Sequence, residues 1–109
     1  MYVRVTTFRA APEVIEDAVA TYREQAVPWM RDATGFRGWM VLIDREEGRS
    51  IGLTFWSDDR AMRDDNVSGA GLRDEIARSS GTPMESLAFY EVLAAEALAL
   101  EELQGGAPD

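Results

Sequence analysis

The sequence contains no cysteine and no histidine, and all 11 of its basic residues are arginine. These absences exclude disulfide bonds, thiolate nucleophiles, imidazole bases, ligation of haem iron by His or Cys, and the usual zinc sites. Schiff-base chemistry on lysine is excluded as well. Any general base must therefore be a carboxylate or an indirectly activated water.

Long hydrophobic runs are also missing. The run over residues 39–43 is among the longest, and it is far too short to cross a bilayer. No signal-peptide pattern opens the chain, because Arg4 interrupts the apolar start. The formal net charge of -9 argues against a nucleic-acid partner, since binding to phosphates needs a basic stripe. We therefore expect a cytoplasmic protein with neither nucleic acid nor membrane as a partner.

The length and composition favour one folded domain. The chain has 109 residues, of which 46% are hydrophobic and 28% charged, so it lies well away from the composition of disordered chains. No internal repeat or linker divides it. We expect a domain over residues 1–94 and an acidic tail over residues 95–109 that forms a short helix and then becomes disordered.

Hydrophobic periodicity predicts four strands and two helices. The strands are expected where residues alternate or are β-branched, over residues 2–8, 36–44, 49–56 and 86–94. The first helix is expected to begin at Pro12 and to run for roughly 16 to 20 residues, with a kink or restart at Pro28. The second is expected to follow an N-cap at Ser57, to break within residues 66–71, and to end at Gly81.

The order strand, helix, hairpin, helix, strand predicts an α+β fold of the ferredoxin-like βαββαβ type with a four-stranded antiparallel sheet. Aromatic residues on both sides of the strands would leave an apolar sheet face uncovered, which favours a homodimer. Arg4 and Arg37 would then pair with carboxylates of the partner. The alternative is a monomer whose open face is kept wet by polar side chains, namely Arg4, Thr6, Arg37 and Thr54.

Five segments carry a family resemblance: the opening strand, the long helix, and residues 34–38, 51–57 and 89–93. They are similar to the antibiotic biosynthesis monooxygenase family, within the dimeric α/β-barrel superfamily, over about residues 1–94. The resemblance implies a homodimer whose sheets form a barrel, with a ligand cavity between helices and sheet in each protomer. It further implies either cofactor-free oxidation of aromatic polyketides or quinols, or degradation of haem.

The haem-degrading branch does not fit these residues. Its pattern has an Asn on the first strand, and a Trp and a His on the second helix. This chain has Thr6 and Thr7 on that strand, and neither Trp nor His on that helix. We therefore expect no haem degradation and no cofactor.

Two polar residues are candidates for binding an anion. Asn66, at the expected helix break, could direct its amide to an oxyanion, and Arg73 could neutralise a phenolate or carboxylate. The alternatives are a local backbone role for Asn66 and surface pairing of Arg73 with Asp74. Candidates for lining an aromatic pocket, each with ordinary packing as its alternative, are Tyr22, Trp39, Trp56 and Phe89.

Four aspartates gather at the start and middle of the second helix: Asp58, Asp59, Asp64 and Asp65. Carboxylates could bind a hard cation, but the spacing is not that of an EF-hand loop. Charge at a helix N-terminus explains the cluster more simply, so we expect no metal site.

Two hypotheses of function follow. The first is a cofactor-independent monooxygenase acting on a small aromatic or polyketide-type substrate, with Asn66 and Arg73 as catalytic residues. The second is a non-catalytic homodimer that binds a small aromatic ligand or supports a partner enzyme. The missing histidine favours the second, because a catalyst would have to recruit another base.

Overall fold

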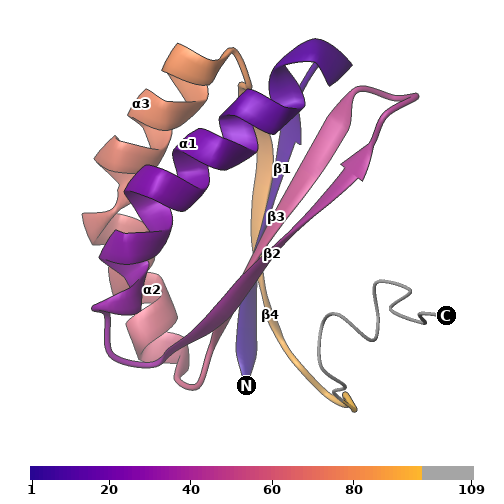
Figure 1. Ribbon diagram of the computed structural model, residues 1–109. Helices are drawn as coiled ribbons and strands as arrows, with labels where there is room; N and C mark the ends of the chain where they lie inside the picture. The colour runs from indigo at the N-terminus through magenta and orange to yellow at the C-terminus, as the bar shows by residue number, and fades with distance from the viewer. Residues whose placement is uncertain (97–109) are drawn as a thin grey trace, which may run out of the picture.

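The computed structural model describes residues 1–96. Its elements, in chain order, are β1 (Tyr2–Arg9), α1 (Pro12–Arg31), β2 (Phe36–Asp44), β3 (Arg49–Trp56), α2 (Asp59–Ser68), α3 (Ala70–Ser80) and β4 (Met84–Glu91). The strands form one antiparallel sheet in the order β2-β3-β1-β4. The helices all lie on one face of this sheet (Figure 1). The predicted α+β ferredoxin-like fold is confirmed. Most of the tail expected over residues 95–109 lies outside the described residues.

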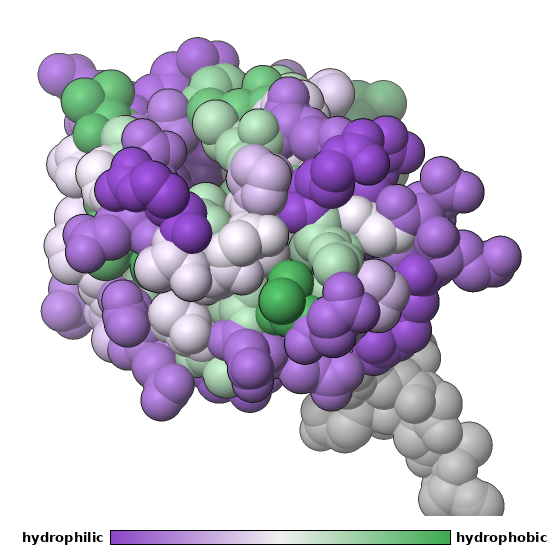
Figure 2. Space-filling view, turned by 90° about the horizontal axis from the view of Figure 1, so that it is seen from above, coloured by the Kyte–Doolittle hydropathy of each residue, from purple (hydrophilic) through white to green (hydrophobic). Residues whose placement is uncertain are grey.

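Among the described residues, no helix is long and apolar enough to cross a membrane. Seen from above, hydrophilic side chains form much of the surface at this end of the molecule, and apolar side chains appear between them (Figure 2).

The helices largely follow the sequence signals. Pro12 occupies the first turn of α1, where its missing N–H needs no partner. The helix continues through Pro28 to Arg31, so the expected restart is wrong. Val27 and Met30, on either side of Pro28, are both buried, and their packing keeps the helix continuous there. The N-cap of α2 is Asp58 rather than Ser57, because the Asp58 carboxylate accepts hydrogen bonds from two backbone N–H groups of the first turn.

The expected break in the second helix is confirmed at Gly69, which separates α2 from α3. This residue is buried, and its backbone N–H donates to the Asp65 carbonyl at 2.8 Å. The end of α3 at Gly81 is also as expected, with a left-handed φ of 69° that glycine adopts without strain.

Two strand details differ from the prediction. β4 ends at Glu91 rather than at residue 94, because Glu91 pairs with Tyr2, the first residue of β1, and no further strand residue is available beside it. In β2 an irregularity between Phe36 and Gly38 shifts the register. It turns Phe36 toward the helices, where its ring meets Trp56 edge-on at a centroid distance of 5.3 Å.

The sheet faces are assigned differently from the expectation for three polar residues. Arg4, Thr6 and Thr54 point toward the helices and are buried, so they do not wet the open face. Side chains alternate along a strand, and Trp56, two residues beyond Thr54, is buried against the helices. Because the Trp56 indole is buried against the helices, Thr54 faces the same way, and so do Arg4 and Thr6 on the paired strand β1.

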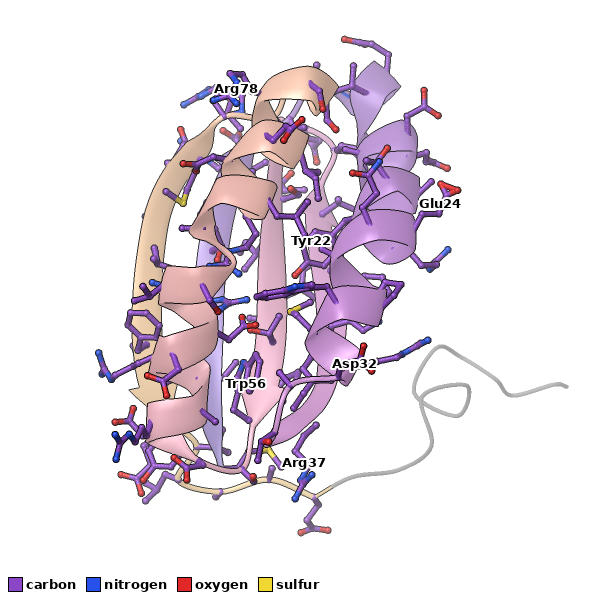
Figure 3. All side chains as sticks on the ribbon, turned by 90° about the vertical axis from the view of Figure 1, so that its left-hand side faces the viewer. Tyr22, Glu24, Asp32, Arg37, Trp56 and Arg78 are labelled. Atoms are coloured by element: carbon purple, nitrogen blue, oxygen red, sulfur yellow. The ribbon has the colours of Figure 1, made fainter. Side chains whose placement is uncertain are left out.

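The hydrophobic core lies at the lower end of the helix-covered face in Figure 3. Trp56 is its largest side chain and is fully buried, with Nε1 donating to the Thr54 hydroxyl at 3.0 Å. The other buried members come from the helices: Ala26, Val27, Met30, Met62 and Ile76.

Candidate functional site

A cavity lies between α1, α3 and the sheet, beside the core. Its volume is about 70 Å³, several times what a single water molecule needs. The sheet provides the floor and the two helices provide the walls. Like ligand sites in general, it is concave and mostly apolar, with a few convergent polar groups.

Side-chain size along β3 explains why the space is open. The residues of this strand that face the helices are Ser50, Gly52, Thr54 and Trp56. Trp56 fills the region beneath the helices at one end, whereas the three small residues leave room at the other. The α1 surface above this floor is formed by Ile15, Ala18 and Val19, none of which is large enough to close the gap.

The charged centre of the site is an ion pair between Arg4 of β1 and Asp65 of α2. Arg4 Nη1 donates to Asp65 Oδ2 at 2.7 Å, and both side chains are 1% exposed. Arg4 also approaches the Met30 sulfur at 3.6 Å and lies 5.9 Å from the Trp56 ring centroid. Two charges this deep must be paired, because the cost of removing either from water is several kcal/mol.

The second carboxylate oxygen of Asp65 lacks a hydrogen-bond partner of this kind within the described part of the chain. Oδ1 is buried and has no hydrogen-bond partner among residues 1–96. A desolvated acceptor left in this way costs about 1–3 kcal/mol. Such groups are uncommon in folded proteins, and they often mark a place where function rather than stability sets the arrangement.

Arg73 of α3 completes the cluster from the cavity wall. Its Nη1 donates to the same Oδ2 of Asp65 at 3.3 Å, and its Nη2 donates to the Asn66 backbone carbonyl and to Asn66 Oδ1, the latter at 3.3 Å. Burial, and then the nearby charge of Arg4, lower the pKa of Arg73 below its usual range. The Arg73 guanidinium can occupy this position because residue 69 is glycine, since a Cβ there would lie 2.5 Å from Arg73 Nη1.

Tyr22 of α1 faces the cavity from the other side, in the space between the helices (Figure 3). Its hydroxyl lies 3.8 Å from the sulfur of Met30, a weak acceptor. Burial raises the pKa of Tyr22, and the charges of Arg4 and Arg73 oppose this shift only in part. At neutral pH the phenol is therefore protonated and available as a hydrogen-bond donor.

The sequence-predicted site residues fall into three groups. Tyr22 and Arg73 line the cavity, and Asn66 holds Arg73 from outside the lining. Trp39 does not line the cavity either; it packs on Tyr22, with ring centroids 5.7 Å apart. Trp56 and Phe89 do not line the cavity, contrary to expectation; they pack in the core beside it, where burial of large aromatic surface is most favourable.

The sequence analysis missed Arg4 and Asp65 as parts of the site. Two signals were present. An arginine in the middle of an alternating strand is unusual, and Asp65 follows Met62 by three residues, which places the carboxylate on the apolar face of α2. Neither signal identifies the other residue as its partner.

The ion pair leads to a stability prediction. Replacing Asp65 with Ala leaves the Arg4 charge buried and unpaired, and should lower the free energy of unfolding by about 3–5 kcal/mol in denaturant titrations. Asn66→Ala is the matched control, because Asn66 is half-buried and its amide should contribute only about 1 kcal/mol. Equal losses in the two variants would contradict this description of the ion pair.

Two curated proteins resemble this chain in sequence over most of its length. No protein-family model matches it. Two uncharacterised proteins of Mycobacterium tuberculosis, Rv2557 and Rv2558, are each 32% identical to it, over 84 and 77 residues respectively. These matches cover 76% and 71% of this chain, but only 38% and 33% of the relatives. The chain thus spans less than two fifths of the length of the curated relatives it matches.

Solved structures share the fold at low sequence identity. The monooxygenase ActVA-Orf6 of Streptomyces coelicolor, in complex with nanaomycin D, superposes with a TM-score of 0.72 at 18% identity, covering 90% of this chain and 92% of that one. The cofactor-independent oxygenase SnoaB of Streptomyces nogalater gives 0.63 at 18% identity, covering 86% and 94%. The haem-degrading protein MhuD of Mycobacterium tuberculosis gives 0.64 at 17% identity, covering 89% and 100%.

Structural superpositions at sequence identities this low establish the fold, but they do not establish the reaction. The chain therefore has the fold of the antibiotic biosynthesis monooxygenase structures, an α+β ferredoxin-like domain with a four-stranded antiparallel sheet.

Proposed function

We propose that this protein is a homodimeric, cofactor-independent monooxygenase that acts on a small aromatic or polyketide-type substrate held in the cavity. The observation that carries the proposal is the convergence of Arg4, Arg73 and Tyr22 on one end of an otherwise mostly apolar space. An apolar enclosure suits a ring system, and the polar end suits one oxygen of that ring system.

The polar end would stabilise a substrate anion. Guanidinium groups and a protonated phenol, fixed before the substrate arrives, lower the energy of an enolate or phenolate more than water does. Such an anion can reduce dioxygen directly. In an anthrone, the ring CH2 group becomes C=O: one oxygen atom enters the product, and the other leaves as water with the two hydrogens.

The source of the base limits the substrates that fit. The chain has no histidine, and no carboxylate among residues 1–96 lines the cavity; Asp65 lies outside the lining, where its Oδ2 accepts hydrogen bonds from two arginines. The substrate must therefore be acidic enough to lose its proton to water as the arginines bind its anion. Anthrones and related phenolic ketones meet this requirement, which is why they are the first substrates to assay.

The comparisons support the proposal in one respect. Two of the structures with this fold are a monooxygenase in complex with nanaomycin D and a cofactor-independent oxygenase. A haem-degrading protein shares the fold as well, so the fold alone does not select the reaction. The weight of the proposal rests on the cavity.

The second candidate function is non-catalytic binding of a small ligand in the same cavity. The observation that favours it is again the lack of a carboxylate in the lining, because Asp65, the one buried acidic side chain among residues 1–96, lies outside it. A protein of this kind would bind the ligand with the same residues but consume no dioxygen. Turnover therefore separates the two functions.

Dimerisation forms the other part of the proposal, with residues 1–94 as the folding unit. The sheet face opposite the helices carries an apolar set of paired residues: Val3, Val5, Met40, Leu53 and Phe55. The neighbouring Leu42 is 45% exposed. A continuous apolar sheet surface is an unfavourable feature of a monomer, and packing it on the same face of a second copy buries both.

Oxygen uptake tests the reaction. We expect the protein to consume dioxygen with a simple anthrone, and Arg73→Gln to reduce kcat/KM at least tenfold, which corresponds to about 1.4 kcal/mol of anion stabilisation. Arg78→Gln, on the same helix but exposed, should leave kcat/KM unchanged. Absence of uptake in the unmodified protein would instead support the binding function.

A cavity-filling variant tests the site itself. Gly52 lies on the cavity floor, and a Cβ added there would make only an ordinary contact of 3.8 Å with the Phe8 ring. Gly52→Val should weaken binding of the anthrone at least tenfold, as KM or in a fluorescence titration, without loss of stability.

The control for this variant is Gly71→Ala on α3, where an added Cβ meets nothing within 4 Å. It should stabilise the helix by about 1 kcal/mol and leave anthrone binding unchanged. If Gly52→Val binds the anthrone as tightly as the unmodified protein does, the cavity is not its site.

A charge on the open sheet face tests the dimer. Leu53→Asp would place two carboxylates against each other across a symmetric interface, so sedimentation velocity should show monomers at concentrations where the unmodified protein is dimeric. Val67→Asp is the control, because Val67 is 78% exposed on α2, on the helix side of the sheet. A Leu53→Asp variant that stays dimeric would refute this interface.

A further inference from the structure

We infer that the cavity takes its ligand as a monoanion, whose charged oxygen replaces the Asp65 carboxylate as the partner of the Arg73 guanidinium. The inference rests on the proposed use of the cavity as the ligand site. It adds the charge of the ligand and the residue that recognises this charge.

The charges of the cluster do not balance. Two guanidinium groups, of Arg4 and Arg73, share one carboxylate, that of Asp65. The three side chains therefore hold one positive charge in excess, in a place where the Arg73 side chain is only 16% exposed. A largely buried charge that is only partly compensated is unfavourable, so the cluster favours a single additional negative charge.

The two arginines are not paired equally. The Asp65 oxygen lies 2.7 Å from Arg4 but 3.3 Å from Arg73. The remaining contacts of Arg73 go to neutral acceptors, the backbone carbonyls of Asp65 and Asn66 and the Asn66 amide oxygen. Arg73 is therefore the cation whose charge is less well compensated, and a ligand anion gains most by binding there.

A ligand in the cavity can reach the Arg73 guanidinium. Arg73 and Tyr22 both line the cavity, and they reach it from different helices. The Tyr22 hydroxyl donates its single proton to the Met30 sulfur at 3.8 Å, a weak acceptor that a ligand oxygen could replace. A carboxylate or phenolate placed between them would accept one charged and one neutral hydrogen bond. Asp65 would remain with Arg4, and the buried pair would stay intact.

The rest of the lining limits the ligand to one charge. Beyond this end the lining is uncharged: it consists mainly of apolar side chains, among them Phe8, Ile15, Val19 and Val41, with the hydroxyls of Thr6, Ser50 and Thr82. A second anionic group would meet no cation there, and a neutral ligand would leave the excess positive charge uncompensated. The class of ligand is therefore a small, apolar carboxylate or phenolate, such as an aromatic acid or an acidic phenol.

The experiment compares ligands of equal shape and different charge. Benzoate and benzamide are titrated into the unmodified protein, with binding followed by calorimetry and by amide chemical shifts, and isophthalate serves as the dianion. We expect benzoate to bind at least tenfold more tightly than either of the others. Arg73→Gln should abolish the difference between benzoate and benzamide.

Two further variants test the position and the balance of the charges separately. Gly69→Ala keeps every charge but displaces the Arg73 guanidinium, since the new Cβ would occupy its place; the preference for benzoate should fall although the net charge is unchanged. Asp65→Asn raises the excess charge and should improve isophthalate binding relative to benzoate. If this buried substitution prevents folding, Gly69→Ala and Arg73→Gln still decide the question.

Equal binding of benzoate and benzamide, a preference that survives Arg73→Gln, or no binding of benzoate at all would each overturn the inference. These outcomes differ from failure of the oxygenase proposal. Benzoate binding through Arg73 without oxygen uptake from any anthrone would retain the inference and reject the reaction. Oxygen uptake with an anthrone, but no preference for benzoate over benzamide, would retain the reaction and reject the inference.

Discussion

The structure depends on one buried ion pair, Arg4 with Asp65, which connects the central strand β1 to α2. Its two residues are 61 positions apart in the chain, so the contact forms only when the sheet and the second helical segment are docked together. Once formed, it fixes α2 relative to β1 and places the Asp65 carboxylate where Arg73 can donate a hydrogen bond to it. The break at Gly69 then turns α3 so that Arg73 lies at the cavity wall.

The two faces of the sheet differ in an unusual way. The face under the helices carries arginine, threonine, serine and glycine at one end and Trp56 at the other. The face away from the helices carries a more uniform apolar set. A protein that needed only a stable core would place these residues the other way round. The observed arrangement is understandable if one face has to bind a ligand and the other a second copy of the chain.

Local patterns predicted the elements well, because periodicity, proline and glycine act within a few residues. The order of elements, the break near Asn66 and the proximity of Asn66 to Arg73 followed from such signals. The faces did not, because both sides of β2 are apolar and alternation alone does not say which side is inside. Arg4 was assigned to the wrong face because its partner, Asp65, is distant in sequence. Trp56 and Phe89 were assigned to the pocket because large aromatics attract attention, whereas a cavity forms where side chains are small.

The segregation of small and large residues along β3 has a consequence for how such a protein can change. Ser50, Gly52 and Thr54 shape the cavity floor, and only Thr54 touches the side chain that anchors the core. Substitutions at positions 50 and 52 can therefore reshape the chamber while the packing around Trp56 is preserved. Divergence among descendants of such a chain could thus alter which molecules are accepted without first eroding the fold that accepts them.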